Sequence, residues 1–393
     1  MERIARIQAE LAKAGIDGWL FFDFHNRDPI SYRILGLEFG KFTSRRWFYL
    51  VPKSGQPVKL VSAVEAGKLD ALPGEKRVYR SWRELLDHLR GMLDGLSTVA
   101  MQYSPRGDVP YVSIVDAGTV ELVRAAGVEV VSSAPLVQVF EAVLTPEQLE
   151  SHVKAGEKIH RIKDEAFALV SQKVRGGHVI TPYDVQQFIV RRFEEEGLTC
   201  QGEYPIVGTN EQPADPHFEP TPENARPIKL GDTLLVDLWA KLKEPNAVFY
   251  DITWCAFVGE NPPAKYSEIF RLACQARDAA LALVQERFAQ GQPLAGYEVD
   301  DAARQVIEKA GYGPYFVHRT GHNIGTEVHG NGANLDNLET RDNRLLVPGL
   351  CFSIEPGIYL PGEMAVRTEI NVFITHDGKP QLYGPIQKEL VLL

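Results

Sequence analysis

The chain has 393 residues, of which 44% are hydrophobic and 24% charged, and its formal net charge is −10. This length exceeds one ordinary hydrophobic core, so two domains are expected. The negative balance, without a long basic run, argues against a nucleic-acid surface and against anionic lipid as a partner. No apolar run approaches the ~18 to 20 residues of a membrane span, so we expect no membrane association.

The cysteines and the first residues indicate the compartment. None of the four cysteines forms a CxxC pair, which favours reduced thiols over a disulfide framework. The start, MERIARIQAELAKAG, is typical of an amphipathic helix and lacks the apolar region of a signal peptide. We therefore expect a cytoplasmic protein.

Residues 1 to about 145 alternate between helix and strand patterns. The expected elements are a helix over 2–14, a strand in DGWLFFD, a hairpin of RRWFYLVP and PVKLVSA around Ser54-Gly55, a helix over 82–93, a strand in STVAMQY, a helix over 112–126 and a strand in VEVVSS. This order predicts a small α/β sheet domain.

Thr145, followed by Pro146 and Glu147, is a helix-start signal, and we place the domain boundary there. Long helices are expected over residues 146–175, 182–197, 265–289 and 298–310. The prediction is a mixed α/β (α+β) chain with domains 1–145 and 146–393.

The second domain contains an internal repeat at an offset of 114 residues. DEAFALV from Asp164 aligns with DAALALV from Asp278, and the further matches are Gly177 with Gly291, Tyr183 with Tyr297, Val185 with Val299, and Gly197 with Gly311. We expect two copies of helix, helix and acidic hairpin, with a site where the copies meet.

Four acidic residues form two pairs with the same internal spacing. Asp237 and Asp251 are 14 positions apart, as are Glu355 and Glu369, and each pair begins six residues after a glycine. Their strand-like apolar flanks predict buried carboxylates, which are costly unless they are paired or bind a metal. Convergence of all four predicts one cation, or rather two, to offset their repulsion.

Histidines supply a nitrogen ligand for such a site. The segment HRTGHNIGTEVHG carries His318, His322 and His329, and His217 lies in the loop before the first acidic strand. An oxygen-rich site with one histidine suits Mn²⁺, Co²⁺, Fe²⁺ or Zn²⁺ better than a thiolate-type zinc site. Two ions about 3.5 to 4 Å apart would activate a water and polarise a carbonyl, which is machinery for amide hydrolysis.

Four motifs carry a family resemblance. DLWA…YDIT, HRTGHNIG…EVH, SIEPGIYLPG and VRTEI closely resemble the pita-bread metallopeptidases, family M24, which hold methionine aminopeptidase, aminopeptidase P and prolidase. The last three are similar to the Xaa-Pro branch, and the resemblance covers essentially the whole chain. It implies a creatinase-like N-terminal α/β domain, a C-terminal pita-bread domain with an internal pseudo-two-fold repeat, and a homodimer.

The resemblance also implies roles for individual residues. The metal ligands would be Asp237, Asp251, His322, Glu355 and Glu369. Asp251 and Glu369 match the carboxylates that bridge two divalent ions, with Mn²⁺ ahead of Co²⁺ and Zn²⁺, and Glu355 matches the proton shuttle. Three histidines match those that contact substrate and stabilise the tetrahedral intermediate, and one arginine matches the residue that steadies the site: His217, His318, His329 and Arg367.

The chain departs from the family pattern without losing a ligand. The family's DxG is Asp-Leu-Trp with Trp239, its DITR ends in Trp254, and Asn323 replaces a glycine of GHGIG. Gly330 and Ile370 stand where acids are usual, and KEPNAV lengthens the first hairpin turn. These departures concern substrate preference and the residues around the ligands.

The implied function is hydrolysis of the amide bond before proline in small proline-containing peptides. An Xaa-Pro dipeptidase (prolidase-like) leads, and an Xaa-Pro aminopeptidase acting on longer peptides is the alternative. A non-catalytic pita-bread binding protein and a creatinase-like hydrolase that works without metal are the rivals from other classes.

Substrate recognition gives two further expectations. Because the amide nitrogen before proline carries no hydrogen, ring shape must be recognised, and Phe218, Phe316 and Tyr359 are candidates for an aromatic wall. A dipeptidase also needs a clamp for the substrate carboxylate, and the candidates are the arginines of the front domain, Arg27, Arg33, Arg45 and Arg46.

Overall fold

The computed structural model describes residues 2–393. The chain divides into two compact units, Met1–Glu141 and Ala142–Leu393, so the division falls just before the expected boundary at Thr145. Within the described residues, no helix combines the length and the apolar composition needed to cross a membrane. The four cysteines are all buried and free.

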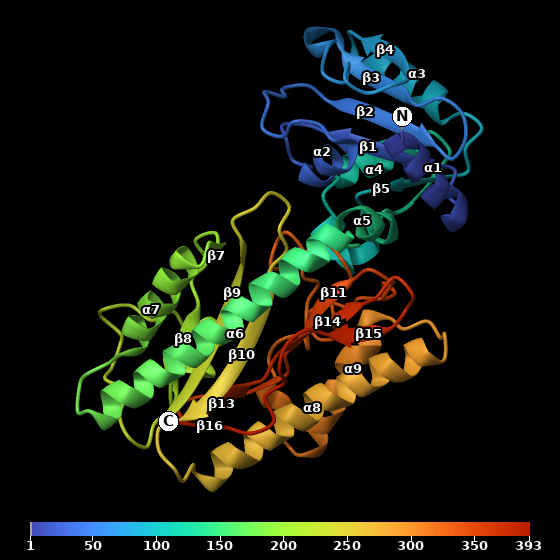
Figure 1. The fold of residues 1–393 in the computed structure, drawn as a ribbon. Helices are drawn as coiled ribbons and strands as arrows, with labels where there is room; N and C mark the ends of the chain where they lie inside the picture. Colours follow the sequence, from blue (N-terminus) through green and yellow to red (C-terminus); the bar gives the residue numbers. More distant parts are fainter. Residues whose placement is uncertain (1) are drawn as a thin grey trace. The chain divides into compact units, whose positions relative to one another are not determined.

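The first unit is built on one six-stranded sheet in the order β4-β3-β2-β1-β5-β6 (Figure 1). Its strands are β1 (Gly18–Asp23), β2 (Trp47–Pro52), β3 (Val58–Ser62), β4 (Glu75–Tyr79), β5 (Thr98–Met101) and β6 (Glu129–Ser132). Its helices are α1 (Glu2–Ala14), α2 (Pro29–Leu35), α3 (Trp82–Leu93), α4 (Ala117–Arg124) and α5 (Ala134–Glu141). β2 and β3 pair antiparallel as the predicted hairpin, whereas β5 runs parallel to both β1 and β6.

The helix predicted over 112–126 was too long. The α-helix α4 begins only at Ala117, because the Asp116 side chain accepts a hydrogen bond from the Thr119 amide and caps it there. Val112 instead ends a short 3₁₀ turn, η3 (Pro110–Val112). The sequence patterns also did not reveal α2, β4 or α5.

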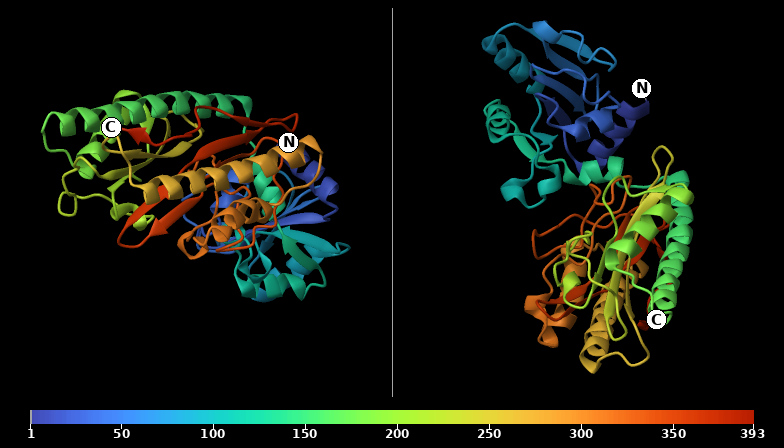
Figure 2. Two further views of the ribbon diagram at one scale, coloured as in Figure 1. Left: turned by 90° about the horizontal axis from the view of Figure 1, so that it is seen from below. Right: turned by 90° about the vertical axis from the view of Figure 1, so that its left-hand side faces the viewer.

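The second unit contains two helix pairs and two sets of strands. The helices are α6 (Pro146–Arg175), α7 (Pro182–Glu195), α8 (Ala264–Ala289) and α9 (Gly296–Lys309). The strands are β7 (Leu198–Thr199), β8 (Ile206–Thr209), β9 (Thr233–Leu242), β10 (Tyr250–Phe257), β11 (Cys351–Ile354), β12 (Gly357–Leu360), β13 (Met364–Arg367), β14 (Ile370–Ile374), β15 (Pro380–Leu382) and β16 (Val391–Leu392). Figures 1 and 2 both show α6 lying along β9 and β10, and α8 contacts β11 and β13.

The two halves of this unit end their helices in the same way but start them differently, since Pro263 at the start of α8 makes no side-chain capping bond. Thr145 and Thr181 open α6 and α7 with capping boxes, and each helix has proline in its first turn. Glycines at matched positions of the repeat share the left-handed backbone conformation that favours glycine: Gly177 and Gly291 after the first helix of each copy, Gly197 and Gly311 after the second, and Gly231 and Gly349 before the hairpin strand.

The strand register places the four acids. In the β9–β10 hairpin Asp237 lies opposite Thr253, and Asp251 lies opposite Trp239. Since side chains alternate along a strand, the two aspartates lie on the same face of the hairpin. In the second copy, the last β11–β14 pair is Ile354 with Ile370, so Glu355 and Glu369 occupy adjacent positions at its end.

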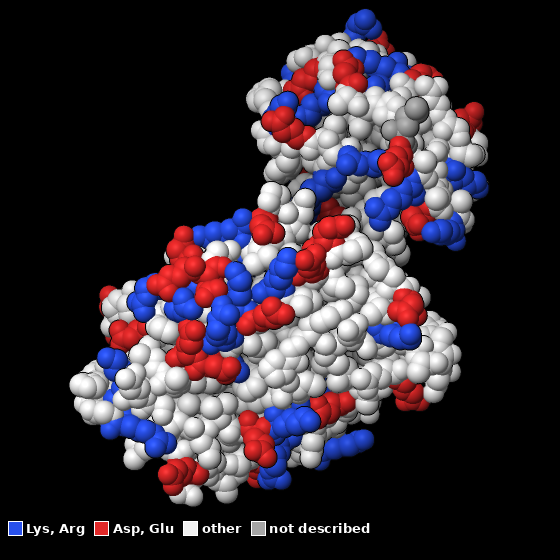
Figure 3. Space-filling view, viewed as in Figure 1, with Lys and Arg blue, Asp and Glu red and all other residues white. Residues whose placement is uncertain are grey.

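The charged surface over α6 is a mixture of both signs. On the face shown in Figure 3, Lys and Arg alternate with Asp and Glu over α6. The ion pairs there include Lys154 with Glu150 at 2.6 Å and Arg161 with Glu196 at 2.6 Å. Such exposed pairs contribute little stability, and their mixed charge offers no basic face for nucleic acid.

Close packing between α6 and β10 depends on Gly156. A Cβ at this position would lie 2.4 Å from the ring of Tyr250, which is buried. Helix propensity alone would favour alanine in an α-helix by about 1 kcal/mol. We expect Gly156→Ala instead to lower the free energy of unfolding by about 1–3 kcal/mol, because the ring has no room to move away.

The matched control is Gly91→Ala in α3. There a Cβ would meet only the flexible end of Arg77, at 3.3 Å. We expect this variant to retain or slightly raise stability, in line with helix propensity. Urea unfolding of both variants measures the difference, and equal stabilisation by both would contradict the packing argument.

Candidate functional site

Five predicted ligands come from five different segments of the second unit. Asp237 lies on β9 and Asp251 on β10, while Glu355 directly follows β11 and Glu369 directly precedes β14. His322 lies in the loop that leads from α9 to β11. The four members Asp237, Asp251, His322 and Glu369 are at most 6% exposed.

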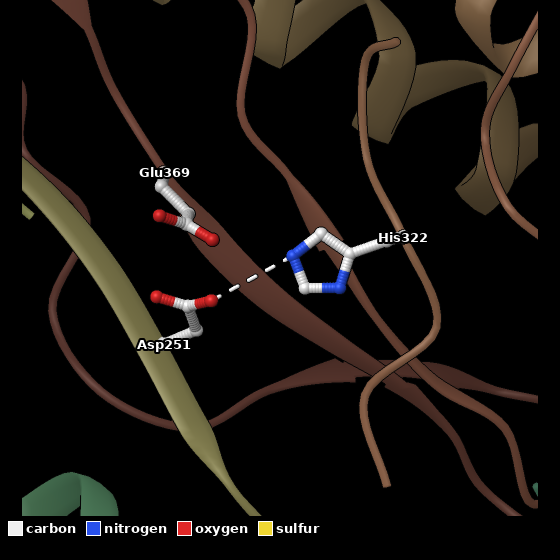
Figure 4. Close-up of side chains that lie close together, drawn as sticks. All are labelled: Asp251, His322 and Glu369. Carbon is white, nitrogen blue, oxygen red and sulfur yellow. Dashed lines mark ion pairs between the residues drawn. The ribbon is translucent and has the colours of Figure 1, made fainter. Parts of the chain in front are cut away.

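Three of these side chains converge directly. Asp251, His322 and Glu369 each offer a ligand atom, and these atoms all lie within 4.8 Å of one another. Figure 4 shows both carboxylates and the imidazole facing one common space. The His322 Nε2 atom is 3.6 Å from Asp251 Oδ2 and 3.2 Å from Glu355 Oε1, which brings the fourth predicted ligand into the group.

Asp237 joins the group through Thr253 and Arg367. The Thr253 Oγ1 lies 3.0 Å from Asp237 Oδ1 and 2.8 Å from Glu369 Oε2, and it accepts a hydrogen bond of 3.0 Å from Arg367 Nε. Arg367 also forms an ion pair with Asp237. Because a hydroxyl has one hydrogen, Thr253 can donate to only one of the two carboxylates at a time.

The arrangement leaves carboxylate oxygens that fit a cation. Asp251 Oδ1 and Glu369 Oε1 are buried, and neither has a hydrogen-bond partner among residues 2–393. Buried carboxylate oxygens are normally satisfied, and one that is not calls for another ligand. Carboxylates with one imidazole are donors that Mn²⁺, Co²⁺, Fe²⁺ and Zn²⁺ accept, so the residues present fit divalent metal ions.

The pKa shifts show how costly this concentration of acids is. Burial raises the pKa of Asp237 to about 7, and burial also raises the pKa values of Asp251 and Glu369. Burial opposes a charge on His322, but hydrogen bonds to Asp251 and Glu355 outweigh it and raise its pKa to about 9. The protonated imidazole thus takes the place of a cation beside the carboxylates.

Glu355 behaves differently from the other acids. Burial would raise its pKa, but the hydrogen bond and the charge of His322 outweigh this effect and hold the pKa below its usual range. Ser353 Oγ adds a hydrogen bond of 3.0 Å to Glu355 Oε1. Glu355 is therefore ionised over the whole physiological range of pH.

The backbone around His322 fixes the direction of its ring. The His322 amide donates to Ser353 Oγ at 3.0 Å, and the His322 carbonyl accepts from the Ser353 amide at 2.9 Å. A Cβ on Gly321 would lie 2.0 Å from the Ser353 carbonyl oxygen, so glycine allows this close approach. The Nδ1 of His322 lies 3.2 Å from the Asn323 carbonyl, which leaves Nε2 turned to the carboxylates.

The Asn323 and Gly330 departures from the family pattern belong to one packing arrangement. The side-chain Nδ2 of Asn323 donates to the Cys351 carbonyl at 2.8 Å, and its Oδ1 accepts from the Gly332 backbone amide at 2.8 Å. A Cβ on Gly330 would lie 2.2 Å from Asn323 Oδ1. The asparagine therefore occupies space that exists because residue 330 is glycine, and it ties the histidine loop to β11.

His318 lies in a hydrogen-bonded chain with Tyr359 and Arg367. Its Nδ1 is 2.7 Å from the Arg319 carbonyl, so this nitrogen carries the hydrogen, and Nε2 accepts from the Tyr359 hydroxyl at 2.7 Å. Arg367 Nη1 donates to the same hydroxyl at 2.9 Å. Burial lowers the pKa of His318 to about 4, so the imidazole is neutral. Both of its nitrogens are engaged within the protein.

The other two histidines lie at the exposed side of the site. The ring of His329 stands edge-on to that of His322, with centroids 4.4 Å apart. The charge of His322 lowers the pKa of His329 to about 3, and His217 acts in the same direction. His217 is exposed in its loop, and its effect on His329 links it to the site.

Thr253, Ser353 and Tyr359 complete the site, and the motifs did not reveal the role of any of the three. Thr253 could have been found, since it lies two residues after Asp251 on the same face of β10. Ser353 likewise lies two residues before Glu355. The hydroxyl of Tyr359 gave no such signal, because Arg367 lies across the β12–β13 hairpin and His318 is 41 residues away.

Metal binding should release protons. The raised pKa values of Asp237 and His322 mean that both groups hold protons near pH 7, which a cation must displace. We expect the apparent affinity for Mn²⁺ to rise between about pH 6 and 9, as those protons leave. Calorimetric titration in buffers of different ionisation enthalpy measures the release, and a binding heat that does not depend on the buffer would contradict it.

Removing the Thr253 hydroxyl should weaken metal binding. We expect Thr253→Val to lower Mn²⁺ affinity by about 10- to 100-fold, because Asp237, Glu369 and Arg367 lose their common partner. Thr233→Val is the control. Thr233 lies on β9 and is buried like Thr253, but its hydroxyl bonds Asn210, away from the site. Equal Mn²⁺ affinities in the two variants, measured by calorimetry, would rule out this role.

Comparison with known proteins places this geometry in a family. Residues 154–376 match Peptidase_M24, metallopeptidase family M24. The chain is 32% identical over 235 residues to "Xaa-Pro dipeptidase" of Lactobacillus helveticus and 34% identical over 250 residues to "Xaa-Pro dipeptidase" of Lactobacillus delbrueckii subsp. lactis. These matches cover 60% and 63% of this chain, and 58% and 61% of the two relatives, so the chain spans about three fifths of the length of the curated relatives it matches.

Solved structures agree in fold. The dipeptidase PepE from Mycobacterium ulcerans superposes with a TM-score of 0.70 at 24% identity, over 100% of this chain and 97% of that one. The Xaa-Pro dipeptidase from Bacillus anthracis gives a TM-score of 0.61 at 23% identity, over 100% and 99%. The predicted mixed α/β class with a C-terminal pita-bread domain is confirmed. Because the family match includes all five converging ligands and spans more than half of the chain, the protein belongs to metallopeptidase family M24.

Proposed function

We propose that the protein is a dinuclear metal-dependent peptidase that hydrolyses the amide bond before proline, acting as an Xaa-Pro dipeptidase. The observation that carries this proposal is the convergence of Asp251, His322 and Glu369, with two buried carboxylate oxygens that lack partners among residues 2–393. The similarity to two chains named "Xaa-Pro dipeptidase" supports the choice of substrate.

Five side chains would hold two divalent ions: Asp237, Asp251, His322, Glu355 and Glu369. When bound, such ions lower the pKa of a water and polarise the carbonyl of the scissile bond. Asp251 and Glu369 suit the bridging position, because each is buried and has one oxygen without a protein partner in the described chain. Mn²⁺ leads, and Co²⁺ or Zn²⁺ are the alternatives.

Glu355 is the candidate for proton transfer. It is ionised, and its Oε1 is held by Ser353 and His322. Its other oxygen, Oε2, makes neither of these contacts and can accept the proton of the attacking water and pass it to the proline nitrogen. The nitrogen must receive this proton because it would otherwise have to leave as a strongly basic anion.

The hydrogen-bonded chain of Arg367, Tyr359 and His318 supplies polar groups beside the carboxylates, where Arg367 pairs with Asp237. The Tyr359 hydroxyl is oriented from both sides, at 2.9 Å from Arg367 Nη1 and at 2.7 Å from His318 Nε2. We propose that the Tyr359 hydroxyl turns its one hydrogen from His318 Nε2 to the developing oxyanion, while Arg367 continues to donate to the hydroxyl oxygen and His318 positions the hydroxyl before the reaction. His329 and His217, at the exposed side, would contact the substrate.

Proline recognition falls to a smaller set of aromatic residues than the sequence indicated. Phe316 is 2% exposed and lies under the Arg304 guanidinium, 4.2 Å from the ring centroid, so it belongs to the core and not to a substrate wall. Phe218 is partly exposed and remains a candidate. A cavity of about 170 Å³ beside His329, lined also by Phe249 and Glu327, offers room for a substrate side chain.

The carboxylate clamp has fewer candidates as well. Arg33 forms two hydrogen bonds to Glu141, of 2.7 and 2.9 Å, inside the first unit. Arg45 bonds the Ser44 carbonyl at 3.0 Å. Arg27, Arg45 and Arg46 remain candidates, because Arg45 is exposed and bonds only the neighbouring residue.

We also propose that the protein forms a homodimer and is located in the cytoplasm.

Loss of the Glu355 carboxylate should abolish turnover without unfolding the protein. We expect Glu355→Gln to lower kcat for Ala-Pro by about 10²- to 10⁴-fold, the usual contribution of a general acid–base group. Glu363→Gln is the control, since Glu363 is exposed and pairs with Lys265 at the surface. Steady-state kinetics at saturating Mn²⁺ decide, and turnover by Glu355→Gln close to that of the control would remove Glu355 from the mechanism.

The proposal as a whole is tested by metal removal and a substrate panel. We expect hydrolysis of Ala-Pro to stop after chelation and to return with Mn²⁺, and Ala-Pro-Ala to be cleaved more slowly. Faster cleavage of Ala-Pro-Ala would identify an aminopeptidase. Full turnover of the chelated protein would favour a metal-independent hydrolase, and metal binding without turnover of any proline peptide would favour a binding protein.

A further inference from the structure

A buried ion pair on α9 faces the histidine loop. Asp300 is 0% exposed and Arg304, one turn later, is 9% exposed. The Arg304 Nε and Nη2 atoms donate to the two oxygens of Asp300, at 3.1 and 3.0 Å. A buried charge pair requires further hydrogen bonds to offset its lost hydration. Four of them come from the loop over residues 316–320, and the Asn337 amide donates one more to Asp300 Oδ2 at 2.9 Å.

The hydrogen bonds between this ion pair and the loop involve backbone groups and one hydroxyl group. Arg304 donates to the Phe316 and His318 carbonyls, each at 2.9 Å. Asp300 Oδ1 accepts from the amide and the hydroxyl of Thr320, at 2.9 and 2.6 Å. The guanidinium and the carboxylate thus form hydrogen bonds with alternate residues of the loop, namely Phe316, His318 and Thr320.

These hydrogen bonds continue into the site. The Thr320 carbonyl accepts a hydrogen bond of 2.7 Å from the Glu355 amide. His318, whose carbonyl is held by Arg304, directs Nε2 to the Tyr359 hydroxyl. Both the proton-transfer candidate and the oxyanion candidate therefore rest on backbone that α9 fixes.

The internal repeat provides a comparison within the same chain. At the offset of 114, Asp300 corresponds to Gln186 and Arg304 to Val190, both on α7. Gln186 is 1% exposed and donates to the Pro205 carbonyl at 2.9 Å. Both copies therefore use this helix position to hold the loop that follows, but only the copy that carries His318 and His322 uses a charged pair.

We propose that Asp300 and Arg304 are positioning residues for the metal site, which act by fixing the backbone of residues 316–320 and, through it, Glu355 and His318. The two copies differ because their loops have different roles. In the first copy, one hydrogen bond from Gln186 holds the loop at Pro205. In the second copy, alternate loop residues must be fixed to position catalytic groups. The kinetic part of this inference rests on the proposed function.

The test compares Arg304→Met with Gln186→Met. Each change removes a buried polar group from the second helix of one copy and keeps a long apolar side chain. We expect both variants to melt at lower temperature. Only Arg304→Met should lose Mn²⁺ affinity and kcat for Ala-Pro, each by about 10- to 100-fold, at temperatures equally far below each melting point. Gln186→Met should stay within about twofold of wild type.

Arg304→Lys separates positioning from charge balance. Lysine keeps a cation beside Asp300 but lacks the fork that reaches both carbonyls. We expect it to regain thermal stability and to remain about 10-fold weaker in Mn²⁺ affinity. Full recovery of affinity by Arg304→Lys, or equal losses in Arg304→Met and Gln186→Met, would overturn the proposal. If wild type binds Mn²⁺ but cleaves no proline peptide, the proposed function fails, while the comparison of affinities still decides the positioning role.

Discussion

Four carboxyl groups lie together in the interior of the second unit, on strands or directly beside strand ends whose neighbouring residues form apolar cores. Removal from water and mutual repulsion both act against their ionisation, and the raised pKa values of Asp237, Asp251 and Glu369 express this cost. A small number of positive or hydrogen-bond-donating groups offset part of this cost. Arg367 pairs with Asp237, Thr253 lies between Asp237 and Glu369, and His322 lies beside Asp251. The remaining unpartnered oxygens are where divalent ions would complete the balance.

The internal repeat explains how a chain can bring these groups together. Each copy contributes one pair of acids from paired strands, so neither copy alone has to concentrate four negative charges. The histidine comes from the loop before the second hairpin, and Gly321 lets that loop pass close to Ser353. The two copies have diverged around the loop, where Asp300 and Arg304 replace the Gln186 and Val190 of the first copy.

The sequence predicted what depends on local pattern and missed what depends on distant contacts. The helix α6 was predicted at its observed bounds, because Thr145 and Pro146 mark its start and a basic last turn and Gly176 mark its end. The acidic pairs were found because spacing and apolar flanks are visible in one strand at a time. The parts played by Thr253 and Tyr359 were not, because their hydrogen-bond partners lie on the far side of a hairpin or in segments 41 to 116 residues away. The boundaries of α4 failed for a local reason, since the cap at Asp116 lies inside the apolar run that suggested a longer helix.

On our proposal, five side chains from the two copies would hold two divalent ions. Anomalous diffraction from crystals of the full chain soaked in Mn²⁺ tests it most directly. We predict two peaks in the space bounded by Asp237, Asp251, His322, Glu355 and Glu369, with Asp251 and Glu369 in contact with both. An absence of peaks there at saturating Mn²⁺, or binding only at surface carboxylates, would contradict the account.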